Sequence, residues 1–84
     1  MSQADKIRAY ANRALIEPAR NAGRTEVAID ARDIHKDLRL RSRMPAVCGA
    51  LDAKRFQDDY RVALNRRTGP LQGSAARWIF SLKN

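Results

Sequence analysis

The fold is decided by residues 30–54, DARDIHKDLRLRSRMPAVCGALDAK, a stretch typical of two short helices joined by a tight basic turn. Asp30 is placed to cap the first helix, and Asp33 three residues later completes a capping-box pattern. Ile34 and Leu38 stand one helical turn apart, so they share the face that leans on a core. This stretch therefore predicts a helix-turn-helix pair.

The second helix of the pair, expected over residues 43–54, has an apolar inner face and an outer face of small residues. Ser42 is a good N-cap, and Pro45 falls in the first turn, where its missing N–H costs nothing. The inner face comprises Met44, Val47, Cys48 and Leu51, and the outer face comprises Ser42, Ala46, Gly49 and Ala53. We expect the helix to end or bend near Lys54, because an unbroken helix would put Phe56 on the small outer face.

The N-terminal stretch predicts the clearest amphipathic helix. Ser2 with Asp5 offers a capping box at its start. Pro18 predicts a kink or a loose last turn, and Gly23 is a natural stop. The apolar stripe consists of Ile7, Tyr10, Ala11, Ala14, Leu15 and Pro18. Because this stripe is rich in alanine and has no Trp or Phe anchor, core packing is favoured over contact with a membrane.

Three short β-favouring segments complete the pattern. Residues 25–29, TEVAI, predict a strand of three or four residues that needs partners. The partners are expected in residues 61–67, RVALNRR, and in the last segment, where Ala76, Trp78, Phe80 and Leu82 alternate. Between these two segments, residues 68–74, TGPLQGS, carry turn signals. We therefore expect a β-hairpin with a flexible tip.

Length and composition are those of one globular domain covering residues 1–84, with 44% apolar and 31% charged residues. A single cysteine excludes an internal disulfide framework and a cysteine-based zinc cluster. No apolar run approaches the roughly 20 residues that cross a bilayer, and the polar N-terminus is unlike a secretory signal. The expected location is the cytoplasm.

The net charge of +8 is unevenly distributed. Residues 61–84 hold five basic residues and no acid, whereas residues 44–60 hold two basic and three acidic residues. A polyanion responds to such a local field within a Debye length of roughly 8 to 10 Å. Arginine makes up most of the excess, and its planar fork suits phosphate oxygens and guanine edges.

The order helix, short strand, helix, turn, helix, hairpin resembles the winged helix-turn-helix superfamily over nearly the full length. EPAR at 17–20, residues 28–38, RMPAVCGAL at 43–51 and RTGPLQG at 67–73 are similar to a set of small prokaryotic winged-helix domains. The resemblance implies an α+β fold with three helices, a short strand and a C-terminal β-hairpin wing. It also implies that residues 43–54 enter the major groove and that the hairpin tip touches the backbone or the minor groove. Arg39 departs from the pattern, because a glycine is common at this turn.

Catalysis and metal binding are poorly supported. His35, the only histidine, is expected on the solvated surface, and Cys48 as an inert core thiol. Asp30 and Asp33 have capping duties, and Asp37 is expected to pair with Lys36 or Arg41. The TGPLQGS segment precedes a strand and lacks the lysine of a phosphate loop. We expect no enzymatic activity, no cofactor and no metal.

Binding of double-stranded DNA is the leading hypothesis. Arg41 and Arg43 flank the start of the second helix, where free N–H groups attract phosphate. The predicted nucleic-acid-binding residues are Arg41, Ser42, Arg43, Ala46 and Lys54 at the helix (about 43–54), and Arg66, Arg67, Gln72 and Arg77 at the wing (about 66–77). We expect the two arginine clusters to lie side by side as a concave cationic surface. Since the small outer face offers few base-reading side chains, phosphate contacts should dominate, as in a transcriptional or architectural regulator of the nucleoid.

Two other functions stay open at this stage. The small face of the second helix could dock a protein partner or a second copy of the chain, so a homodimer is an alternative. RNA binding is less favoured, because most of the aromatic residues are needed for the core and leave no stacking platform.

Overall fold

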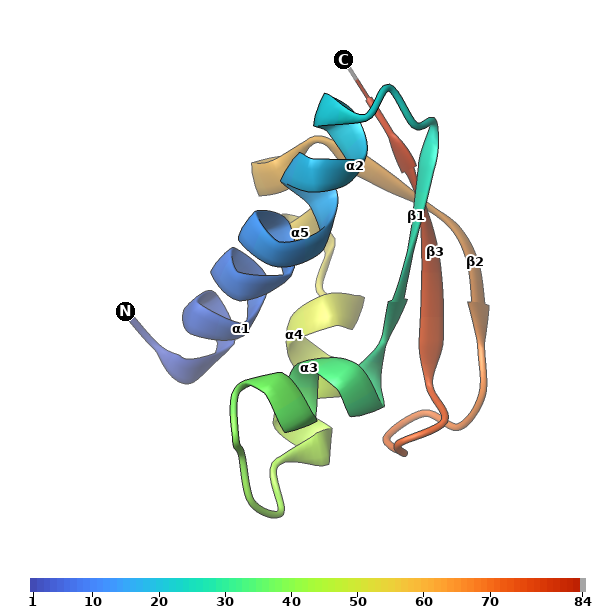
Figure 1. Cartoon of the computed structure of the whole chain (residues 1–84). Helices are drawn as coiled ribbons and strands as arrows, with labels where there is room; N and C mark the ends of the chain where they lie inside the picture. Colours follow the sequence, from blue (N-terminus) through green and yellow to red (C-terminus); the bar gives the residue numbers. More distant parts are fainter. Residues whose placement is uncertain (84) are drawn as a thin grey trace.

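The computed structural model describes residues 1–83, which form an α+β fold with four helices on one side of a three-stranded antiparallel sheet (Figure 1). The strands are β1 (Glu26–Asp30), β2 (Val62–Thr68) and β3 (Arg77–Leu82), in the order β1-β3-β2. The predicted short strand and C-terminal hairpin are thus confirmed. The two ends of the chain supply neighbouring strands, as the sequence indicates.

The first helix runs continuously through α1 (Gln3–Ala11), the π-helical turn η1 (Asn12–Ile16) and α2 (Glu17–Asn21). The capping box at its start is confirmed, because Ser2 Oγ accepts from the Asp5 N–H at 3.1 Å and the Ser2 N–H donates to Asp5 Oδ2. The predicted loosening near Pro18 takes the form of η1, which lies just before the proline. There the Glu17 N–H bonds to the carbonyl five residues back.

Gly23 ends this helix, as predicted. It has a φ of +74°, a conformation that glycine adopts without steric cost. Its N–H donates to the carbonyl of Arg20, and the N–H of Arg24 donates to the carbonyl of Ala19. These two bonds satisfy carbonyls that the helix end leaves free.

Three shorter helices follow: α3 (Ala31–Asp37), α4 (Met44–Asp52) and α5 (Lys54–Tyr60). The predicted end of α4 is confirmed, because Ala53 is extended, with a ψ of 135°. The expectation of three helices is wrong, since α5 is a fourth. The break at Ala53 turns Phe56 inward, where it is fully buried with its ring edge-on to Phe80 at 5.3 Å.

Two predicted helix caps are wrong. Asp30 stands at the N-cap position of α3, but its side chain makes no capping bond and instead accepts from Arg77. Ser42 is left-handed, with a φ of +52°, whereas an N-cap residue that bonds with its side chain is extended. Arg43 occupies the N-cap position of α4 without a side-chain bond.

The pairing of β2 with β3 contains a β-bulge that the sequence pattern does not reveal. Leu64 lies opposite Phe80 and Arg66 opposite Ile79, so Asn65 has no opposite residue. One extra residue shifts the alternation of side chains by one position. As a result Arg67, and not Arg66, lies beside Trp78 on the side of the sheet that the helices cover.

The core lies between the helices and the sheet. Its largest fully buried side chains are Trp78, Phe56, Phe80, Ile7, Ile16, Ile29, Ile34 and Leu51. The predicted inward positions of α4 are confirmed for Val47, Cys48 and Leu51, whereas Met44 is half-buried. Within residues 1–83, no helix combines the length and the apolar character that crossing a membrane requires.

Candidate nucleic-acid interface

Two segments carry most of the predicted site: the α3–α4 connector (residues 38–43) and the hairpin loop (residues 69–76). Both lie at the lower end of the molecule in Figure 1, with α4 between them. Cys48 on α4 places its Sγ 3.9 Å from the carbonyl oxygen of Gly73, so the hairpin loop rests against α4. The two segments therefore share one end of the molecule.

The connector presents its arginines to solvent. Arg41 and Arg43 are exposed, and so is Arg39, which the predicted site did not include. None of these three guanidinium groups forms an ion pair within residues 1–83. Ser42, also exposed, lies between two of them.

His35 ties the connector to α3. Its Nε2 accepts from the Arg43 N–H at 3.3 Å, and its carbonyl accepts from the Leu40 N–H at 3.1 Å. The residue is half-buried, so it lies at the surface as expected, with one ring nitrogen bonded to the connector. At the other side of α3, Asp37 accepts from the Tyr10 hydroxyl at 2.8 Å and not from Lys36 or Arg41 as predicted.

The guanidinium group of Arg67 forms its contacts within the protein. Its Nε and one terminal nitrogen donate to the two oxygens of Asp52 at 2.7 and 3.1 Å, and its guanidinium stacks over the Trp78 ring at 4.8 Å. The indole N–H of Trp78 donates to Asp52 as well, at 2.7 Å. We call this group the Asp52–Arg67–Trp78 cluster. It joins the end of α4 to both strands of the hairpin, and its hydrogen bonds hold the pKa of Arg67 above the ordinary value.

The same guanidinium anchors the hairpin loop. Arg67 donates to the carbonyl oxygens of Pro70 at 3.0 Å and Leu71 at 2.8 Å. At the start of the loop, Gly69 has a φ of +85°, and a Cβ there would lie 2.3 Å from the Ala75 carbonyl oxygen. The loop whose tip we expected to be flexible is therefore tethered by Arg67 and closely packed at Gly69.

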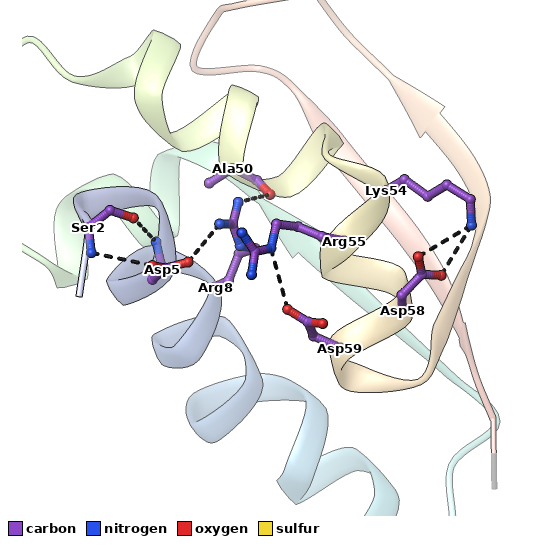
Figure 2. Close-up of polar contacts among 8 residues, drawn as sticks. All are labelled: Ser2, Asp5, Arg8, Ala50, Lys54, Arg55, Asp58 and Asp59. Atoms are coloured by element: carbon purple, nitrogen blue, oxygen red, sulfur yellow. Dashed lines mark hydrogen bonds and ion pairs between the residues drawn. The ribbon is translucent and has the colours of Figure 1, made fainter.

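Two further predicted cations have acidic partners. Lys54 pairs with Asp58 along α5 at 3.1 Å, an exposed contact drawn in Figure 2. Arg77 pairs with Asp30 across the sheet at 3.4 Å. Arg66, by contrast, is exposed without an ion pair within residues 1–83, and it lies on the side of the sheet away from the helices. Gln72 in the hairpin loop is exposed too.

The outer face of α4 is narrower than predicted. Ala46 and Ala53 are half-buried, whereas Gly49 is exposed and has open space where a side chain would lie. The exposed stripe consists of Pro45, Gly49 and Asp52.

On the buried side of α4, Arg8 of α1 donates to the Ala50 carbonyl at 3.3 Å and pairs with Asp5, as Figure 2 shows. This contact fixes the end of α4 against the first helix.

Fewer of the predicted cations are therefore free of ion pairs than the expected cationic surface requires. Asp52, Asp58 and Asp30 neutralise Arg67, Lys54 and Arg77, respectively. Among the predicted residues, the cations without an ion pair in residues 1–83 are Arg41, Arg43 and Arg66. Arg39 joins them, and its place in the turn of the helix pair is the sequence feature that could have identified it.

Two observations concern metal ligands and the single thiol. No three His, Cys, Asp or Glu side chains of residues 1–83 converge as metal ligands. Cys48 is fully buried, and desolvation raises the pKa of its thiol, which disfavours the reactive thiolate. The chain matches no protein-family model, no curated protein and no solved structure.

Proposed function

We propose that this chain is a winged helix-turn-helix domain that binds duplex DNA, with α4 as the recognition helix and the β2–β3 hairpin as the wing. The observation that carries the proposal is the row of exposed arginines in the α3–α4 connector, Arg39, Arg41 and Arg43, which have no acidic partner within residues 1–83. They precede α4 directly, where the helix dipole adds to their positive field. Arg66 adds a fourth unpaired cation on the hairpin.

Phosphate contacts supply most of the affinity in this proposal. The exposed stripe of α4, Pro45, Gly49 and Asp52, has no donor fork that could read a base edge, and Asp52 is already bonded to Arg67 and Trp78. Sequence preference is then modest, and affinity falls steeply with salt because bound arginines displace counterions from DNA. Such a protein acts as an architectural component or as a transcriptional regulator of low specificity.

The test is a fluorescence-anisotropy titration of a labelled duplex at several salt concentrations. The variant Arg41→Ala/Arg43→Ala is expected to lower the magnitude of the slope of log K against log salt by about 2, since each lost phosphate contact removes about 0.9. Arg24→Ala/Arg55→Ala is the matched control: it removes the same charge from exposed sites outside the connector and the hairpin. The proposal is wrong if both double variants reduce the slope equally.

A protein-docking function is the second candidate, favoured by the open space over Gly49 on the exposed stripe of α4. Small residues permit a partner helix to approach closely. The same titration separates the two functions, because even nonspecific DNA binders reach Kd values below roughly 100 μM. No binding in this range favours the protein partner, and competition with a structured RNA tests the remaining nucleic-acid alternative.

A further inference from the structure

The hairpin loop carries a leucine, Leu71, whose side chain is mostly exposed to solvent. Leu71 is 76% exposed, whereas Leu64, the other exposed leucine of the hairpin, is 40% exposed. Pro70 and Gln72, its neighbours, are exposed as well. An apolar side chain held in water gains free energy when a partner covers it. Leu71 is therefore the position of the loop that gains most from contact.

Arg67 holds the backbone of the loop at Leu71. Arg67 bonds to the carbonyls of Pro70 and Leu71 while Asp52 and the Trp78 ring fix its own position. Pro70 packs closely on Gly73, where an added Cβ would meet the proline ring at 2.4 Å. A tethered loop loses little conformational entropy on binding, so contact with Leu71 is less costly than contact with a mobile tip.

The charges around the loop select the chemical class of the partner. Residues 61–83 contain no acid, and Arg66 lies unpaired on the hairpin. The acids contributed by other elements are Asp52 and Asp30, which pair with Arg67 and Arg77, Asp33, which lies beside Ser74 and Ala75 on the α3 side of the loop, and Glu26 of β1, which accepts from Asn65 farther along β2. The apolar tip shares its end of the molecule with the unpaired Arg39, Arg41 and Arg43 of the connector, and this combination suits a ligand with a polyanionic rim and an apolar interior. Stacked base pairs between two phosphate backbones have this character.

We propose that Leu71 is an apolar wedge, which enters the minor groove of bound DNA and inserts at a base step, bending the duplex. This inference rests on the proposed DNA binding and adds to it a mechanism of deformation. Wedges of this kind unstack a step partly and kink the DNA toward the major groove. Because pyrimidine–purine steps unstack most easily, the wedge also favours sites with a TA or CA step beneath the wing.

The experiment measures affinity and bending together, on a duplex of about 25 base pairs with a central TA step and a fluorescent donor and acceptor at its ends. The parent protein is expected to shorten the end-to-end distance. Leu71→Ala should bind about 5- to 10-fold more weakly, as expected for a lost leucine contact, and leave the bound duplex nearly straight. Leu64→Ala is the matched control, since it truncates the same residue type on the same hairpin away from the loop. It should retain both affinity and bend.

The outcomes separate this inference from the function on which it rests. If Leu71→Ala binds and bends the duplex as the parent does, the wedge is wrong and DNA binding stands. The wedge is also wrong, and DNA binding still stands, if the parent leaves the bound duplex straight. The same holds if Leu71→Ala and Leu64→Ala lose affinity and bending equally. If the parent binds no duplex below roughly 100 μM, both proposals fail. If Leu71→Ala changes only self-association in sedimentation, the loop is a protein contact and the wedge is again overturned.

Discussion

The β2–β3 hairpin and the α3–α4 connector are both basic, yet they use arginine in opposite ways. In the hairpin, Arg67 makes four hydrogen bonds within the protein and stacks on Trp78, so its charge stabilises the loop. In the connector, Arg41 and Arg43 lie exposed without an ion pair in residues 1–83. The comparison teaches that a count of basic residues does not distinguish structural cations from available ones.

The largest expected effect is at Asp52, the last residue of α4, which binds Arg67 and Trp78 of the hairpin. Asp52→Ala removes the pair with Arg67 and leaves the indole N–H of fully buried Trp78 without a partner. Losing these contacts should lower the free energy of unfolding by about 2 to 4 kcal/mol, measured by urea denaturation. Asp58→Ala is the control, since its exposed pair with Lys54 is worth about 0 to 1 kcal/mol. Equal losses in the two variants would show that the cluster does not hold the hairpin.

A smaller loss is expected at the first residue of the hairpin loop. Gly69→Ala puts a Cβ against the Ala75 carbonyl at a positive φ, so it should cost about 2 kcal/mol. Gly49→Ala is the contrasting glycine variant, because it lies in α4 with open space around it. It should stabilise the protein by about 0.5 to 1 kcal/mol. If thermal denaturation gives both variants the same sign, the loop is less tightly packed than we describe.

Local chemistry explains which features could be predicted from the sequence. The capping box of Ser2 with Asp5, the stop at Gly23 and the break near Lys54 each depend on residues within a few positions of one another. The alternation of Ala76, Trp78 and Phe80 also identifies the buried face of β3 directly, and all three are fully buried. The order of elements and the inner face of α4 therefore followed from short-range patterns.

The candidate site was less predictable, because it depends on register and tertiary contacts. Extending the alternation of Val62 and Leu64 along β2 points Arg66 toward the core and Arg67 toward solvent, and the bulge at Asn65 reverses these positions. An asparagine within a strand is a weak sign of a bulge. Nothing near Asp52 in the sequence indicates that it bonds to a tryptophan 26 residues away. Helix α5 was missed because its one buried residue, Phe56, gives no helical repeat.

In the connector, by contrast, one substitution is expected to raise the stability of the protein. Ser42 has a φ of +52° without any side-chain hydrogen bond to compensate. Ser42→Gly should relieve this strain and stabilise the protein by about 0.5 to 1 kcal/mol, after the added freedom of the unfolded chain is subtracted. Thermal denaturation measures the gain. The charges of the connector are unchanged, so a loss of duplex affinity in this variant would show that the Ser42 hydroxyl, one of the predicted binding residues, contacts DNA. A destabilised variant would mean that the connector needs this hydroxyl.

The smallest effect is the pH dependence of the contact that secures α3 just before the connector. The hydrogen bond from the Tyr10 hydroxyl to Asp37 raises the pKa of Tyr10 above its ordinary value of 10.0, because the bond favours the protonated phenol. A raised pKa in the folded state means that this stability is fully present below about pH 10 and is lost as pH rises through the folded value. Tyr10→Phe should therefore be less stable than the parent at neutral pH, and urea denaturation should show the difference shrinking at alkaline pH. If this difference in the free energy of unfolding stays constant from neutral to alkaline pH, the Tyr10 hydroxyl contributes through packing. The hydrogen bond to Asp37 would then not stabilise α3.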